Sequence, residues 1–365
     1  MKAADRRRVV RQRLAATLLA PSPGGRPRSV VDTVRHHLAM QAQDLSSGMW
    51  SVGVRTGAPL AQVSAAMEQR LVTRTWPMRG TLHLMATEDV RWMCRLLNAR
   101  AAGSARARFA QLEITDAVLG AGRDLLVAAL AGGVVLSRPA VMDLLRAHGI
   151  RPDGQRGLHL VLRYCQEGLL CQGPPQGGQP TFALVEDWVP RSWDPGREEA
   201  MATLAERYVR SHAPVTERDL AGWCGQGLGF VREAVALAGG HVRTEVIGGV
   251  DHLVHAEAPE PATRPRMMLL PGFDEYLLGY KDRSAVLTAE RERLVVPGGN
   301  GMFLSTVVVG GQVVGTWRRR VGTRRVDLTV TPFAGEPTLP QAALERAATA
   351  YGDFLGLPAT VSSAG

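Results

Sequence analysis

The chain has 365 residues, of which 45% are hydrophobic, so it can bury a large core, and its length predicts two or three domains. Its 43 basic and 34 acidic residues give a formal net charge of +9, and every basic residue except Lys2 and Lys281 is an arginine. This composition excludes a chain that is disordered throughout, and the charge favours polyanionic partners.

The N-terminal segment combines a basic run with a short apolar run. Thr17 interrupts the apolar run from Leu14 to Ala20, so residues 1–25 make a poor signal peptide and a good amphipathic helix. No stretch approaches the roughly 18 apolar residues of a membrane span. The four cysteines form no CxxC pair and have no histidine at metal-ligand spacing; they are Cys94, Cys165, Cys171 and Cys224. We therefore expect a cytoplasmic protein with reduced thiols, no metal and no membrane contact.

A first, divergent copy of a recurring unit follows. Ser29 and Asp32 form a capping pair for a helix that ends near Met40. Two strands are expected at 48–55 and 71–86, with a helix at 60–70 between them.

The unit is clearest in the middle of the chain, where Ser137 and Pro139 mark a helix start. The expected elements there are a helix at 116–133, a strand at 134–136, helices at 138–150 and 157–168, and two strands around a Gly/Pro turn in 169–185. In the next copy Thr216 and Asp219 form a capping box. Its elements are helices at 198–214, 219–225 and 229–239 and a hairpin in 241–256. Helices followed by a hairpin are the layout of a winged helix.

The composition changes beyond Ala258. Residues 256–266 read as a linker, and alternating valine and threonine with glycine turns in 301–333 predict β structure before a closing helix at 339–356. The predicted fold is α+β, with three tandem winged-helix domains and a C-terminal β-barrel-like domain. The predicted domains are winged helices at 1–112, 113–190 and 191–258 and the β domain at 259–365.

Three segments carry a family resemblance: MQAQDL (Met40 to Leu45), RGTLHL (Arg79 to Leu84) and LLPGFDEYLLGYKDR (Leu269 to Arg283). In this order and at these separations they make the chain resemble the AlkZ-type family of winged-helix DNA glycosylases over nearly its full length. In that family a Gln-apolar-Gln motif, or a Gln-apolar-Asp variant, provides the catalytic residues.

The resemblance assigns catalysis to Gln41 and Gln43. It implies a monofunctional glycosylase that acts as a monomer, without a cofactor, on double-stranded DNA. The substrates would be bulky cationic N7- or N3-alkylated purines, including interstrand crosslinks or natural-product adducts of the self-resistance type.

Chemistry explains why two neutral amides could suffice. Glycosidic hydrolysis passes through an oxocarbenium-like state and usually recruits a carboxylate. A purine alkylated at N7 or N3 is already cationic and leaves without being protonated, so the enzyme needs mainly to hold and polarise one water. Two amides at i and i+2 face one space if the backbone is extended, and their oxygens can orient that water.

Neighbouring residues leave alternatives open. Asp44 is a possible alternative base, although we interpret it as the cap of the following turn. Three carboxylates, Asp274, Glu275 and Asp282, are expected to form a structural network neutralised by Lys281 and Arg283. The candidate DNA contacts are Arg79, Arg318, Arg319, Arg320, Arg324 and Arg325, for which a surface ion pair or a solvated hairpin is the alternative.

A winged-helix transcription regulator without catalysis is the competing function. Against it, the candidate recognition helices at 138–150 and 229–240 carry few base-reading side chains. No lysine lies near the QAQ segment, which argues against Schiff-base lyase chemistry there.

Overall fold

The computed structural model describes residues 1–20, 28–99, 101–189, 193–257, 266–299 and 301–363, with the backbone alone at 101–105. It is a mixed α+β structure, as the sequence predicted. The chain forms two compact units, one made of Met1–Val63 with Met201–Gly365 and the other of Ser64–Ala200. None of the described helices is long and apolar enough to cross a membrane.

The unit at 64–200 is built on an antiparallel sheet in which β3, β2, β5, β6 and β4 are neighbours in that order. Its strands are β2 (Val72–Met78), β3 (Thr81–Ala86), β4 (Leu136–Ser137), β5 (Leu170–Gln176) and β6 (Gln179–Leu184). Its helices are η2 (Thr87–Asp89), α5 (Val90–Asn98), α6 (Ala101–Gln111), α7 (Asp116–Leu130), α8 (Arg138–Ala147), α9 (Arg156–Gln166) and α10 (Val185–Trp188). The elements expected from 116 to 185 are therefore confirmed.

The core of this unit comes from helices that bury one apolar face. Leu126 of α7, Leu145 of α8 and Leu160 of α9 are fully buried beside Phe182 of β6. The Ser137 hydroxyl accepts a hydrogen bond from the Ala140 N–H, so this side chain begins α8 as expected.

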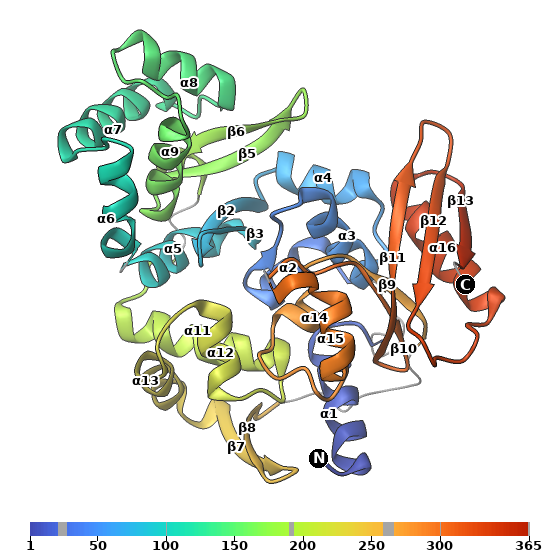
Figure 1. Cartoon of the computed structure of the whole chain (residues 1–365). Coiled ribbons are helices and arrows are strands. Elements are labelled where there is room, and N and C mark those ends of the chain that lie inside the picture. The colour runs from blue at the N-terminus through green and yellow to red at the C-terminus, as the bar shows by residue number, and fades with distance from the viewer. Residues whose placement is uncertain (21–27, 100, 190–192, 258–265, 300, 364–365) are drawn as a thin grey trace. The chain divides into compact units, whose positions relative to one another are not determined.

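In the other unit, residues 201–255 also follow the expected order of helices and hairpin (Figure 1). The elements are α11 (Arg197–His212), α12 (Glu217–Cys224), α13 (Leu228–Ala238), η3 (Gly239–His241), β7 (Val242–Ile247) and β8 (Val250–His255). The capping box of Thr216 and Asp219 is formed at the start of α12, which confirms its prediction.

The N-terminal segment contains one element that differs from expectation. Its elements are α1 (Ala3–Ala16), α2 (Val30–His37), β1 (Met40–Gln41), α3 (Leu45–Thr56) and α4 (Leu60–Glu68). The strand expected at 48–55 is wrong, because this stretch lies inside α3. Asp44 caps the helix and Gly57 ends it in the left-handed conformation with φ +73°. Since α3 is buried from Ser47 to Gly53, its apolar residues do not mark a single helix face.

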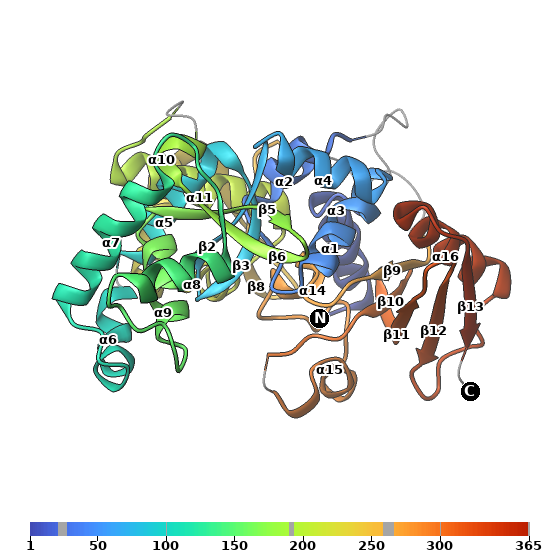
Figure 2. The same cartoon turned by 90° about the horizontal axis from the view of Figure 1, so that it is seen from above.

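The C-terminal strands form a five-stranded sheet in the order β13, β12, β11, β10, β9 (Figure 2). The pair β12 and β13 is parallel and the other pairs are antiparallel. Its strands are β9 (Met268–Leu270), β10 (Thr306–Val309), β11 (Gln312–Val321), β12 (Val326–Pro332) and β13 (Ala359–Ser363). Among the described residues this sheet is open, with β13 and β9 at its edges, so the barrel-like closure is not seen.

Short helices lie between β9 and β10 in the chain, and a long helix packs on the sheet. These helices are α14 (Glu275–Leu278), α15 (Ala289–Val295), η4 (Pro297–Gly299) and α16 (Gln341–Leu355). Tyr351 of α16 contacts Trp317 of β11 and Trp50 of α3, with ring centroids 5.2 and 4.9 Å apart. The helix α16 therefore joins the sheet to the helix that follows the QAQ segment.

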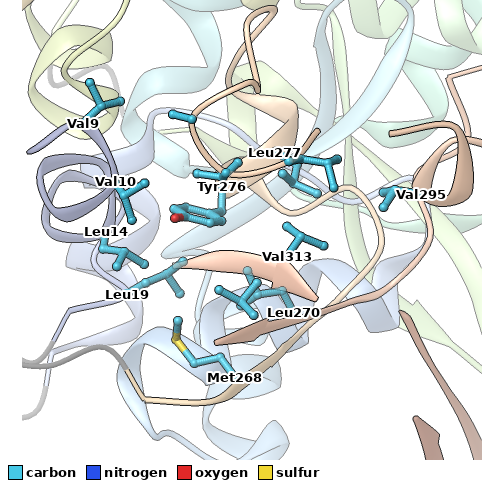
Figure 3. Packing of buried hydrophobic residues seen from close by; sticks show 14 of the residues in the cluster. Val9, Val10, Leu14, Leu19, Met268, Leu270, Tyr276, Leu277, Val295 and Val313 are labelled. Atoms are coloured by element: carbon cyan, nitrogen blue, oxygen red, sulfur yellow. The ribbon is translucent and has the colours of Figure 1, made fainter. Parts of the chain in front are cut away.

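An apolar core joins the N-terminal helix α1 to residues in the segment 268–333 of this unit (Figure 3). Val10 and Leu14 of α1 pack with Leu270 of β9 and Tyr276 of α14. The Tyr276 hydroxyl donates to the Gly311 carbonyl at 2.7 Å, where an added Cβ would meet Val10 at 2.3 Å. Residues near 275 are thereby fixed relative to the N-terminal segment.

Candidate active site

The QAQ segment connects a short strand to a helix. Gln41 ends β1, Ala42 follows it, and Asp44 begins α3. The extended backbone that the sequence required is present at Gln41, whereas Gln43 lies in a bend. Gln41 is 8% exposed and Ala42 is fully buried, while Gln43 is exposed. That both amides line one cavity stays a prediction.

Asp44, which we interpreted from the sequence as the cap of a turn, is the N-cap of the helix α3. Its carboxylate accepts hydrogen bonds from the Ser46 N–H at 3.2 Å, the Ser46 hydroxyl at 2.8 Å and the Ser47 hydroxyl at 2.6 Å. Arg319 of β11 pairs with it at 3.2 Å. Partial burial raises the pKa of Asp44, but the bonds from Ser47 and Ser46 and the charge of Arg319 outweigh it, and the pKa lies below its usual value. These contacts make the carboxylate a weaker base.

The middle residue of QAQ packs directly against α3. A Cβ placed on Gly48 would lie 2.6 Å from Ala42 Cβ and 3.0 Å from Ala42 Cα. Two residues therefore approach as closely as their small size allows. A larger side chain at Gly48 would have to displace either the helix or the QAQ backbone.

We expect Gly48→Ala to shift the QAQ segment and lower the rate of base release by about 100-fold, because catalytic groups tolerate little misplacement. Single-turnover assays would measure the rate, and far-ultraviolet circular dichroism would confirm folding. Gly120→Ala is the matched control, since this α7 glycine has no atom within 4 Å of an added Cβ. A normal rate for Gly48→Ala would show that the close packing does not control the site.

The third motif places two adjacent carboxylates in the core. Asp274 caps α14 and pairs through both oxygens with Arg55 of α3, at 2.8 Å each, while Ser51 donates to it at 2.7 Å. Burial raises the pKa of Asp274, yet Arg55 holds it below its usual value. Removing one partner from a buried ion pair typically costs about 3–5 kcal/mol. This pair therefore fixes α3 to the segment at 274.

Glu275 points to different partners. One oxygen accepts the Gln41 backbone N–H at 3.2 Å, and the other accepts the Trp223 indole N–H at 3.0 Å and lies 3.3 Å from His212 Nε2. The sequence correctly predicted a structural network here but named the wrong partners. Arg283 pairs with Glu292 at 2.8 Å instead.

Sequence reasoning missed Arg55, His212, Trp223 and Gly48. Arg55, His212 and Trp223 lie far in sequence from the residues they contact, whereas Gly48 is close to Ala42 in sequence. None of the four sits in one of the three motifs. The capping pattern of Asp44 before an apolar run was the one local signal that could have revealed α3.

The basic hairpin of β11 and β12 has its turn at Gly322 to Arg325, so Arg324 and Arg325 lie in the turn and not on the facing strand. The structure separates the five arginines into two groups. Arg319 is partly buried against Asp44, and Arg325 pairs with Asp327 at 3.0 Å. The exposed arginines for which the described residues provide no ion pair are Arg318, Arg320 and Arg324.

Arg79 lies at the tip of the hairpin of β2 and β3. Arg79 and Gly80 both have positive φ, 55° and 68°, which is the backbone of a tight two-residue turn. The Arg79 guanidinium is 3.3 Å from His83 Nε2. Burial, and then the charge of Arg79, lower the pKa of His83 to about 3. Arg79 is exposed at this tip, and its contact with a DNA phosphate stays a prediction.

Three potential metal ligands, Glu206, His241 and His255, come together in the described part of the chain. Both ring nitrogens of His255 already face N–H donors, Glu257 N at 3.1 Å and Arg210 Nε at 3.3 Å. A metal needs a free lone pair on a ring nitrogen, so these contacts favour a hydrogen-bonded network. The four cysteines are buried free thiols, as expected.

Comparisons with known proteins agree with this architecture. The model of the family described as DNA glycosylase AlkZ-like matches residues 34–354. The chain is 28% identical over 347 residues to the interstrand DNA cross-link repair glycosylase of Streptomyces sahachiroi, covering 88% of this chain and 89% of that relative. The structure of the Streptomyces sahachiroi DNA glycosylase AlkZ superposes with a TM-score of 0.81 at 26% identity, covering 99% of this chain and 100% of the other.

The fold and these matches define a DNA glycosylase, an enzyme that hydrolyses N-glycosidic bonds in DNA. The chain belongs to the AlkZ-like family of DNA glycosylases. This membership decides between the two classes that the sequence left open, in favour of an enzyme and against a regulator without catalysis.

Proposed function

We propose that the protein is a monofunctional glycosylase that releases bulky cationic N7- or N3-alkylated purines from double-stranded DNA, interstrand crosslinks included. The observation that carries this proposal is the pair of neutral amides, Gln41 and Gln43, in a segment whose backbone is held by a buried carboxylate. The name of the Streptomyces sahachiroi relative, a cross-link repair glycosylase, supports the crosslink part.

In this proposal Gln41 and Gln43 hold one water beside the sugar carbon. The bond from C1′ to the alkylated base nitrogen breaks first, and its electron pair leaves with the base, which becomes neutral. The amide oxygens favour the positive charge that develops on the sugar and accept hydrogen bonds from the water. The water oxygen then bonds to C1′ and its proton passes to solvent. Asp44, already bonded to two hydroxyls and Arg319, remains the alternative base.

The remaining parts of the proposal concern architecture and partners. We propose that three winged helices, divided near residues 112, 190 and 258 and followed by the β domain, act as a monomer on DNA without a cofactor. The helix and hairpin orders at 116–184 and 197–255 support this division.

Base release tests the substrate class directly. DNA treated with a panel of alkylating agents, monofunctional and crosslinking, would be incubated with the protein, and free modified bases would be identified by mass spectrometry. We expect released N7- or N3-alkylpurines. Release of none of them, with intact protein bound to the DNA, would contradict the proposed substrate class.

The hairpin arginines are expected to supply affinity for undamaged duplex. Replacing Arg318, Arg320 and Arg324 with alanine should weaken binding and reduce the slope of log K against log salt by about 1 for each phosphate that the protein no longer neutralises. The matched control replaces the same residues with lysine, which keeps the charges. Unchanged affinity and slope in the alanine variant would mean that the hairpin is only a solvated surface.

A further inference from the structure

We infer that Glu275 is a positioning residue that sets the place of Gln41 from across the core. This inference rests on the proposed function, because it assigns a role relative to the catalytic amide. It explains why a motif near residue 275 accompanies a motif near residue 41, although 234 residues separate the two groups that meet.

The Gln41 N–H is held by a side chain and not by a neighbouring turn. Glu275 Oε1 accepts it at 3.2 Å, and the Glu275 side chain is fully buried. A buried backbone N–H without an acceptor lowers the stability of the folded state. The bond to Glu275 Oε1 therefore holds the QAQ backbone in place. Glu275 thus acts on Gln41 through its backbone.

The position of Glu275 is itself fixed by aromatic partners. His212 Nε2 lies 3.3 Å from Glu275 Oε2, and His212 Nδ1 lies 2.8 Å from the Ser211 hydroxyl and 3.2 Å from the Tyr208 carbonyl. The His212 ring stacks on Tyr208 with centroids 4.6 Å apart. Gly279 leaves the room that this ring needs, since an added Cβ would lie 2.4 Å from His212 Cδ2.

The preceding residue holds the other side of the QAQ segment. Asp274 binds Arg55 and Ser51 on α3, the helix that starts two residues after Gln43. Two adjacent carboxylates therefore hold the backbone before Ala42 and the helix after Gln43. The third motif, Leu269 to Arg283, therefore holds the first motif, Met40 to Leu45, on both sides.

The chemistry of the two Glu275 oxygens yields a test. Each oxygen accepts from a different N–H donor, Gln41 on one side and Trp223 on the other. A glutamine at 275 can keep its oxygen on the Gln41 N–H and donate its NH2 group to His212 Nε2 when the imidazole carries its proton on Nδ1, toward the Tyr208 carbonyl, but that NH2 then opposes the Trp223 N–H. Replacing Trp223 with phenylalanine removes the opposing donor. The amide can then satisfy Gln41 and His212 together.

For four variants, single-turnover rates of base release are measured at saturating protein on one alkylated duplex. The dissociation constant for DNA is measured for the same variants. Glu275→Ala should lower the rate by about 100-fold with little change in DNA affinity. Glu275→Gln should fall between this variant and the wild type. Glu275→Gln combined with Trp223→Phe should be faster than Glu275→Gln alone, with Trp223→Phe as the reference.

Asp219→Asn is the stability control. Asp219 is another fully buried carboxylate that accepts a backbone N–H, that of Lys281 at 2.6 Å, and it has no contact with Gln41 among the described bonds. We expect it to lower the melting temperature while the base-release rate stays near that of the wild type.

A purely structural role for Glu275 predicts the opposite order, with the double variant no faster than Glu275→Gln. That order, or a wild-type rate for a folded Glu275→Ala, would overturn the inference. An inactive wild type would instead overturn the proposed substrate class, so the two failures are distinguishable. If Glu275→Ala does not fold, the comparison of Glu275→Gln with the double variant decides alone.

Discussion

DNA that carries cationic N7- or N3-alkylpurines is expected to lose the modified base to the protein, whereas uracil and 8-oxoguanine should be released at least about 100-fold more slowly, the factor that a missing general acid typically costs. A neutral base leaves as an anion unless a group protonates or strongly stabilises it. The amides of Gln41 and Gln43 cannot donate a proton at any accessible pH. Parallel single-turnover assays on duplexes that differ only in the lesion would measure the ratio.

Gln43→Asp extends this test within the same assay. A carboxylate at this position stabilises the sugar cation and orients the same water, so we expect the variant to remain active on the cationic purines. It also recreates the Gln-apolar-Asp form of the family motif. Rapid excision of uracil by the unmodified protein would refute this mechanism, since it demands an acid or an anion-stabilising group at the site.

Removal of either amide is the second large expected effect. Gln41→Ala and Gln43→Ala should each reduce base release by about 100-fold or more, because the water loses an orienting acceptor and the sugar cation loses a stabilising dipole. DNA binding should persist, since the arginines supply it. Release kinetics and fluorescence anisotropy on the same duplex would separate chemistry from affinity.

Gln111→Ala is a matched control for the amide variants, because this exposed glutamine belongs to the unit at 64–200 and lies in α6. Its rate should equal that of the wild type. Equal rates for Gln41→Ala, Gln43→Ala and the wild type would place the catalytic role elsewhere, with Asp44 as the next candidate.

Local signals in the sequence predicted much of the fold. Ser137 and Thr216 cap the helices that they were expected to begin, and the hairpins at 169–185 and 241–256 fall where glycine turns divide apolar runs. These features depend on interactions between residues that are close in the chain. A single sequence contains them in full.

The stretch at 48–55 shows where local pattern fails. Its alternating apolar residues suit a strand, but burial on nearly all sides of α3 removes the polar face that would have identified a helix. The contact that holds Gln41 could not be predicted from the sequence for a different reason. Its bond to Glu275 spans 234 residues, and no spacing within one sequence reveals which distant carboxylate meets which backbone N–H.

The division of the chain has a consequence for its biosynthesis. Residues 64–200 are contiguous, whereas the unit that holds Gln41 is made of Met1–Val63 and Met201–Gly365. On the ribosome, the inserted unit can therefore finish folding while α3 still lacks Asp274 as the partner for Arg55. In the nascent N-terminal segment, α3 and its Arg55 therefore lack their buried partner until more than half of the chain has been translated. We therefore expect active protein only after the C-terminal portion has emerged, and no partly active enzyme from translation that stops before Asp274.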